Sequence, residues 1–220
     1  MPLALLACET LRDELEYASK LTGVKYDTQW VESGLHNYPD KLRNQMQERL
    51  DSFFGYDKVL MAFGCCGNSV IGLKTGDFEL VIPRVDDCIS MLIGSVEKRI
   101  QVGQNGSIYF LTPGWLRGER NLWAEYSYAV EKYGEDTADM VMESLLGNYT
   151  YLGLLDTECY DVQEVLPSIG HMAQKLKLTQ KIIPASVDYL CNLLVGPWEE
   201  DRFLVVPPNS IVENFLLRIK

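Results

Sequence analysis

Cysteine is the residue type that offers this chain the most chemistry, and the sequence contains six of them. They are Cys8, Cys65, Cys66, Cys88, Cys159 and Cys191. A free cysteine can be a small core residue, a metal ligand or a reactive thiol. Core burial is the commonest of these roles for any single cysteine. Where the cysteines fall relative to the strands therefore decides which chemistry the sequence predicts.

Short apolar runs alternate with amphipathic segments along the whole chain. The runs predict strands at residues 3–7, 25–31, 58–63, 78–82, 108–111, 150–155, 181–183 and 203–206. The amphipathic segments predict helices at residues 10–21, 39–54, 88–92, 121–133, 135–146, 162–176 and 187–194. This alternation favours an α/β fold with largely parallel sheets flanked by helices. We expect two Rossmann-like lobes, with a site between them at the carboxyl ends of the strands.

Two helices separate the halves of the chain and suggest a boundary near their start. The prediction is an N-terminal α/β lobe over residues 1–118, and helices plus a second α/β lobe over residues 119–220. No Pro- or Gly-rich linker marks this boundary, so a single domain with a chain crossover between the lobes is the alternative.

Five of the six cysteines fall at predicted strand ends, where open α/β sheets bind ligands. Cys8 ends the first strand, Cys65 and Cys66 lie in the turn after residue 63, and Cys88 begins a helix after the strand at residues 78–82. His36 lies between a strand and a helix, so its loop opens on the same edge. His171 lies in the middle of a helix, which indicates a structural or surface role.

These residue types on one edge predict a site for a soft metal. Zinc binds Cys and His in tetrahedral geometry, and iron–sulfur clusters bind Cys thiolates. The predicted ligands are Cys8, His36, Cys66 and Cys88.

The other three cysteines are weaker candidates for the metal site. Cys65 is more readily a core residue, and Cys191 is predicted to be core because leucines surround it in its helix. Cys159 follows a strand of the second lobe, so it is a ligand only if the lobes face each other.

The turn after residue 63 also suggests a cradle for an anion or a cofactor, because backbone N–H groups follow a strand there. The predicted contact residues are Gly64, Gly67, Asn68 and Arg84, and Trp115 could wall the pocket. The alternative for Arg84 is an ion pair with Asp86 or Asp87, acids that could instead cap the following helix.

Two further expectations concern thiol reactivity. A helix N-terminus lowers the pKa of a thiol, so Cys88 is expected to have a lowered pKa. A pair of Cys66 with His36 would suit nucleophilic catalysis, although no local sequence signature favours it.

Charge and hydropathy exclude several classes of partner. The chain has 20 Lys and Arg against 31 Asp and Glu, for a net charge of −11. This argues against nucleic acid and anionic membranes, both of which need basic surfaces. No apolar run is long enough for a membrane span, and the N-terminus lacks the basic start of a signal peptide. We therefore expect a cytoplasmic protein with reduced thiols.

Several motifs together resemble one known family. They are Leu35-His36-x-x-Pro39, Phe63-Gly64-x-Cys66-Gly67, Ile82-Pro83-Arg84-x-x-Asp87-Cys88, Leu92-x-Gly94-Ser95 and Thr112-x-Gly114-Trp115. The chain resembles the prokaryotic family called domain of unknown function 1638, over most of its length. The family often has Cys-Gly where this chain has Cys8-Glu9, and His where it has Asp86.

The resemblance implies a cytoplasmic protein of an anaerobe or methanogen, in a setting of corrinoid-dependent methyl transfer. The favoured hypothesis is thus a metal- or metallocofactor-binding protein of anaerobic one-carbon metabolism, with corrinoid or methyltransferase proteins as partners. The alternatives are a binding module for a small anion or a corrinoid, and a Cys-dependent transferase or hydrolase. Whether the protein is an enzyme, and its oligomeric state, stay open.

Overall fold

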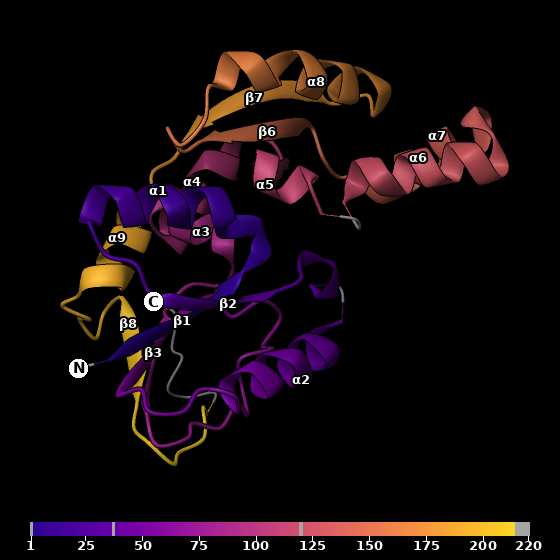
Figure 1. The fold of residues 1–220 in the computed structure, drawn as a ribbon. Coiled ribbons are helices and arrows are strands. Elements are labelled where there is room, and N and C mark those ends of the chain that lie inside the picture. The colour runs from indigo at the N-terminus through magenta and orange to yellow at the C-terminus, as the bar shows by residue number, and fades with distance from the viewer. Residues whose placement is uncertain (1, 37, 119–120, 214–220) are drawn as a thin grey trace.

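The computed structural model describes residues 2–36, 38–118 and 121–213, which form an α/β fold with two sheets (Figure 1). The larger sheet has the order β2-β1-β3-β4-β8. Its strands are Asp27–Val31, Leu3–Cys8, Lys58–Ala62, Glu79–Pro83 and Phe203–Val206. The first four are parallel, and β8 is antiparallel to β4. The smaller sheet is parallel throughout, and its strands are β5 (Ile108–Leu111), β6 (Tyr151–Asp156) and β7 (Thr179–Pro184). The predicted fold class is confirmed.

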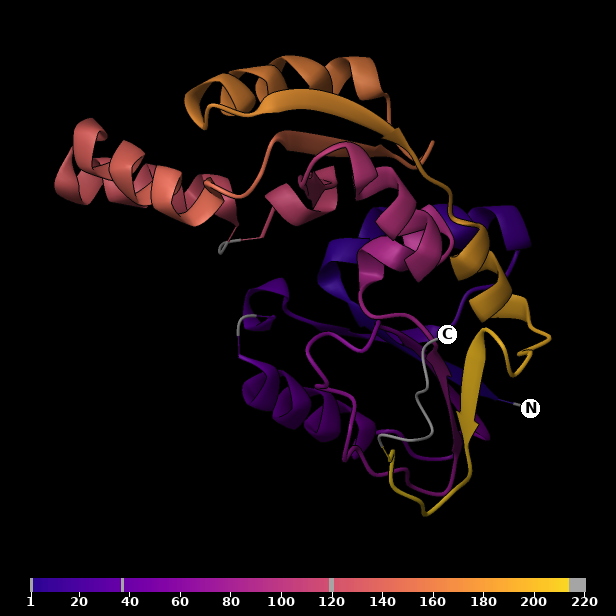
Figure 2. The ribbon, with the colours of Figure 1, turned by 180° about the vertical axis from the view of Figure 1, so that it is seen from behind.

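The helices lie in layers around the two sheets (Figures 1 and 2). α2 (Pro39–Leu50) covers the outer face of the larger sheet, and α8 (Val162–Lys175) covers the outer face of the smaller one. Between the sheets lie α1 (Arg12–Thr22), α3 (Cys88–Ile93), α4 (Val96–Val102) and α9 (Asp188–Val195). α6 (Leu122–Tyr133) and α7 (Glu135–Leu146) project together to one side. The short elements are α5 (Pro113–Leu116) and the 3-10 turns η1 (Glu9–Leu11), η2 (Ser33–Leu35) and η3 (Gly103–Asn105).

The alternation of side chains along β1 shows how the sequence supplies these layers. Ala4, Leu6 and Cys8 pack in the cluster on the α2 side, whereas Leu5 and Ala7 pack in the cluster of the middle helices. Successive side chains of a strand point to opposite faces, so a continuous apolar run fits a strand that is covered on both faces. The middle cluster also contains residues of the smaller sheet, and it therefore joins the two sheets.

Local signals account for most helix ends. α1 ends at Gly23, whose φ of 73° is easily reached by glycine, as the sequence predicts. α2 ends at Leu50, earlier than the predicted end before Gly55. The sequence pattern predicts no helix where α4 and α5 lie. Each of these short helices begins at a capping side chain, Ser95 or Thr112, that accepts a backbone N–H.

The two sheets do not separate at the predicted boundary between residues 118 and 119. β5 precedes residue 118 yet belongs to the smaller sheet, and β8 lies near the end of the chain yet joins the larger sheet beside β4. The chain therefore crosses from the larger sheet to the smaller one and back. The division into 1–118 and 119–220 stays a prediction.

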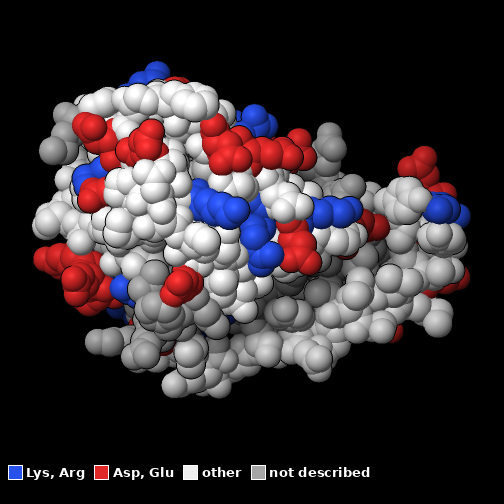
Figure 3. Space-filling model, turned by 90° about the horizontal axis from the view of Figure 1, so that it is seen from below, with Lys and Arg blue, Asp and Glu red and all other residues white. Residues whose placement is uncertain are grey.

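The lower surface of the molecule, in the orientation of Figure 1, carries charges of both signs. A short row of basic side chains crosses this face with acidic groups on either side (Figure 3). The face therefore has mixed charge rather than the continuous basic surface that phosphate backbones require.

A buried carboxyl group lies where α1 meets the smaller sheet. Glu14 is fully buried, and its Oε1 accepts a hydrogen bond from the Thr157 hydroxyl at 3.4 Å. Among the described residues, its Oε2 has no hydrogen-bond partner. Burial raises the pKa of the Glu14 carboxyl to about 7, and the nearby charge of Asp13 also raises it. The group is therefore neutral in acid and is ionised at a cost in weakly alkaline solution.

Glu14→Gln is expected to remove a pH-dependent loss of stability. A folded-state pKa near 7, against an unfolded value of 4.5, favours the folded state at low pH. That contribution is lost as the pH rises from 4.5 to about 7. It amounts to about 3 kcal/mol. Urea unfolding of both proteins across this range measures it. A free-energy difference between wild type and variant that stays constant with pH would contradict the assignment.

Candidate functional site

Three loops carry cysteines to one edge of the larger sheet. Cys8 ends β1, Cys66 lies in the loop after β3, and Cys88 begins α3 after β4. Because β1, β3 and β4 are parallel, their carboxyl ends lie at the same edge. All three cysteines are buried, and all six in the chain are free. The predicted gathering at strand ends thus has a direct topological cause.

Cys8 makes the closest contact with the imidazole at this edge. Its Sγ lies 3.3 Å from Nε2 of His36 and 3.0 Å from the hydroxyl oxygen of Thr10. His36 follows η2, which lies after β2, the strand next to β1. Burial lowers the pKa of the His36 imidazole and raises the pKa of the Cys8 thiol, while hydrogen bonds with Thr10 partly offset the rise.

These shifts bear on the hypothesis of a nucleophilic Cys66–His36 pair. The thiol in contact with His36 belongs to Cys8. Both groups of the contact are held in their neutral forms, whereas an activated pair consists of a thiolate and an imidazolium. The geometry therefore gives no support to a pre-activated nucleophile.

Cys66 and Cys88 lie close enough to the Cys8 thiol for their charges to interact. Burial raises the pKa of the Cys66 thiol well above its usual range, and the charges of Cys8 and Asp87 raise it further. Burial also raises the pKa of the Cys88 thiol well above its usual range, and the charges of Cys66 and Cys8 raise it further. The expectation of a lowered pKa at Cys88 is therefore wrong, because burial outweighs the helix N-terminus. We call Cys8, His36, Cys66 and Cys88 the thiol–imidazole cluster.

Gly64 fixes the loop that carries Cys66. A Cβ at this position would lie 2.5 Å from Cα of Asp87, so only glycine lets the two backbones approach. Across this contact the N–H of Cys65 donates to Val85 O at 2.8 Å, and that of Cys66 donates to Asp86 O at 2.7 Å. The loop after β3 is thereby held against the segment that leads into Cys88.

The next residues of the loop adopt unusual backbone conformations. Cys66, Gly67 and Asn68 have φ values of 43°, 67° and 67°. Left-handed φ at Cys66 and Asn68 costs energy that the surrounding structure must offset, and such residues gather at functional sites. Gly67 faces α2, where a Cβ would lie 3.2 Å from Cγ of Pro39. The loop thus packs on one side against α3 and on the other against the residues that follow His36.

Some hydrogen-bond donors near the anion cradle predicted at Gly64, Gly67, Asn68 and Arg84 are already engaged within the protein. The backbone N–H groups of Cys65 and Cys66 already donate to carbonyl groups. Nε of Arg84 donates to the carbonyl of Phe203 in β8 at 3.3 Å. The cradle itself stays a prediction.

The acids before Cys88 have separate partners. Asp87 caps α3, since its Oδ1 accepts the N–H of Ser90 at 3.0 Å, which confirms the capping alternative. Asp86 forms an ion pair with Arg99 of α4, a partner that the sequence does not predict. Nothing in the sequence pattern identifies Arg99, because the helix that carries it was not predicted.

The smaller sheet supplies the wall opposite the cluster. Trp115 lies in α5, directly after β5, and its ring centroid is 5.9 Å from that of His36 with the planes at 66°. Gly114 allows this approach, because a Cβ there would lie 2.3 Å from the carbonyl oxygen of Thr10. Trp115 therefore packs between the sheets and also lines a pocket.

A cavity of about 500 Å³ lies beside the cluster. Cys88 and His36 line it on one side. Its other walls come mainly from α4, β5 and α5, and the remaining lining residues are Asp87, Ile89, Arg99, Ile100, Gly103, Ser107, Ile108, Tyr109, Phe110, Trp115 and Tyr149. The volume lies within the range of small-molecule sites, which is about 300–1,000 Å³.

The remaining candidates are not members of the thiol–imidazole cluster. Cys65 is buried in the α2-side core, and its thiol donates to Oδ1 of Asn68 at 3.3 Å. Cys159 contacts Thr157 at 3.0 Å near Glu14, and burial raises the pKa of its thiol to about 12. Cys191 packs against the middle core, and His171 is exposed at the edge of Trp123.

The arrangement of the donor atoms bears on metal binding. Within the described residues, no group of three or more His, Cys, Asp or Glu side chains has a geometry that could hold a metal ion as it stands. By chemistry the donor set of the cluster does fit a soft metal, since it offers three thiols and one imidazole. Binding would require the thiols to lose their protons and draw closer together.

A comparison with known families identifies the family of the chain. The family model described as "Protein of unknown function (DUF1638)" matches residues 30–194. The chain belongs to the DUF1638 family. This confirms the resemblance, and the matched region includes His36, Cys66, Cys88 and Trp115, whereas Cys8 precedes it. Searches of curated proteins and of solved structures gave no match. No helix in the described part of this DUF1638 protein is long and apolar enough to cross a membrane.

Gly64→Ala is expected to destabilise the protein by about 1–3 kcal/mol, the usual cost of overpacking. The added methyl group would push the Cys66 loop away from Asp87, because the clash is with backbone atoms. Gly103→Ala is the matched control, since a Cβ there meets nothing within 4 Å. Urea unfolding measures both variants. Equal stability of the two would show that the close approach at Gly64 does not matter.

Proposed function

We propose that the thiol–imidazole cluster binds a soft metal ion or a metallocofactor, either zinc or an iron–sulfur cluster. The observation that carries this proposal is the convergence of three buried thiols and one imidazole from four separate segments of the chain. Core burial explains each cysteine singly. It does not explain why all three share one edge with a histidine, beside a cavity.

The electrostatics of the cluster also support a bound cation. The charge of Cys8 raises the pKa values of the Cys66 and Cys88 thiols, and the charge of Cys66 raises that of Cys88. Three thiolates could therefore not coexist there without positive charge. A metal ion supplies that charge, and the neutral imidazole of His36 could bind it without first losing a proton. Cys8, Cys66, Cys88 and His36 would hold the ion.

We propose further that the cavity beside the cluster admits a small molecule. Zinc, when bound, acts as a Lewis acid that stabilises a thiolate, which suits methyl transfer to or from a thiol. The aromatic residues Tyr109, Phe110 and Trp115 line the cavity and would restrict water. A whole corrinoid is larger than a drug-sized ligand, so in corrinoid-linked methyl transfer we expect it to be carried by a partner protein.

The biological setting of this proposal rests on the family resemblance. We propose a role in anaerobic one-carbon metabolism in a reducing cytoplasm, which six free cysteines support. The net charge of −11 supports small molecules and proteins rather than nucleic acid as partners.

Metal analysis of anaerobically purified protein tests the proposal. Wild type is expected to carry about one equivalent of zinc or one iron–sulfur cluster, and Cys66→Ser to lose most of it. An absorption spectrum separates the two, because only the iron–sulfur cluster is coloured. Metal content that does not differ between wild type and Cys66→Ser would overturn the proposal.

Two further variants make this experiment decisive. Cys191→Ser is the matched control, because Cys191 lies within α9 rather than at a strand end of the larger sheet, and it should keep the metal. His36→Gln changes a side chain that is only half-buried, so it reports on the site if Cys66→Ser does not fold. Circular dichroism shows whether each variant is folded.

Zinc affinity is expected to rise steeply with pH. The pKa values of all three thiols are raised, so a proton must leave each thiol that becomes a ligand. Near neutral pH the affinity should increase up to about tenfold per pH unit for each such thiol. Competition with a chelator at about pH 6 and about pH 8 measures this. An affinity that is independent of pH would exclude the thiols as ligands.

A further inference from the structure

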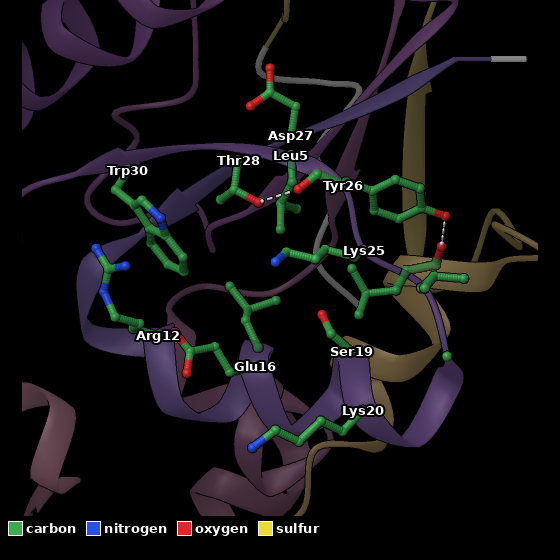
Figure 4. Close-up of a pocket in the computed structure, with 14 residues that line it drawn as sticks. Leu5, Arg12, Glu16, Ser19, Lys20, Lys25, Tyr26, Asp27, Thr28 and Trp30 are labelled. Carbon is green, nitrogen blue, oxygen red and sulfur yellow. Dashed lines mark hydrogen bonds between the residues drawn. The ribbon is translucent and has the colours of Figure 1, made fainter.

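We propose that a second site, in the groove between α1 and β2, binds an anionic molecule with a flat ring. The groove has a volume of about 1000 Å³ and shares no residue with the thiol–imidazole cluster (Figure 4). It exists because β2 is the edge strand of the larger sheet, and α1 packs over β1 without covering its neighbour.

The floor of the groove is apolar and closed. Leu5 of β1, Leu15 of α1 and Leu194 of α9 form it, and all three are buried. The hydroxyl of Tyr26 donates to the carbonyl of Leu194 at 2.7 Å and so ties the β2 side to α9. A ligand would therefore meet a preformed apolar surface at the bottom of the groove.

One end of the groove presents an aromatic ring. The indole of Trp30 hangs from β2 into the groove, with Arg12 on its outer side (Figure 4). The guanidinium carbon of Arg12 lies 4.1 Å from the ring centroid, and Arg12 also pairs with Glu9 at 3.1 Å. One side of the indole is thus occupied, and the other faces the cavity, where a flat ring could stack.

The charge inside the groove is positive. The ammonium end of Lys25 is directed into the space between α1 and β2, and Lys20 lies at the rim (Figure 4). Neither lysine forms an ion pair with another described residue. Of the acids, Asp27 points away and accepts a hydrogen bond from Tyr56 at 2.8 Å, which leaves Glu16 on the groove side.

These features together define the ligand class. An apolar floor and a free indole face favour a planar ring, and two lysines without ion-pair partners favour a phosphate, sulfonate or carboxylate. This local positive charge contrasts with a chain whose net charge is −11, so it is not a general property of the surface.

Two probes with the same ring system test the proposal. Anilinonaphthalene sulfonate carries the ring and an anion, and phenylnaphthylamine carries the ring without a charge. Titration by fluorescence should show that Lys25→Met weakens sulfonate binding by about tenfold, the effect of one lost charge-assisted contact. The same variant should leave binding of the uncharged probe nearly unchanged. Trp30→Leu should weaken both.

Lys132→Met on α6 is the matched control, because that lysine is exposed and far from the groove in the fold. It should bind both probes like wild type. Sulfonate binding that is the same in wild type, Lys25→Met and Trp30→Leu would overturn the proposal. An equal loss of both probes in Lys25→Met would also overturn it, since the anion would then not be recognised.

Discussion

The close approach of two backbones at Gly64 is the constraint on which the candidate site depends. It presses the loop after β3 against the segment after β4, and two backbone hydrogen bonds hold them together. Cys66 and Cys88 lie on either side of this contact, so their thiols can influence each other. The neighbouring Gly67 packs against Pro39 and links the same loop to the turn that carries His36.

A shared layer of helices gives the site its second wall. The middle helices pack against both sheets, and their apolar cluster includes residues from each. This packing brings α5 onto η1, where Gly114 meets the carbonyl of Thr10, and it sets Trp115 against His36. The cavity beside the cluster therefore depends on both sheets, although all four proposed ligands lie at or after the strand ends of the larger one.

Burial decides the protonation of nearly every group of interest. It raises the pKa values of the Cys8, Cys66 and Cys88 thiols and lowers that of His36, so the cluster is neutral without a bound cation. The groove between α1 and β2 differs in kind, because its two lysines are exposed and neither forms an ion pair with another described residue. One protein thus offers an uncharged, buried donor set and, separately, an open basic groove.

The sequence by itself determined the order of the strands and of most helices, because periodicity and capping act over a few residues. It also placed Cys8, Cys66, Cys88 and His36 at one edge, since parallel strands must share the direction of their carboxyl ends. Only the tertiary structure decided that His36 contacts Cys8, that burial raises the pKa of Cys88, and that β8 returns to the larger sheet. These outcomes depend on which distant segments pack together. Contacts of that kind are fixed by the shapes of whole layers, which no short stretch of sequence specifies.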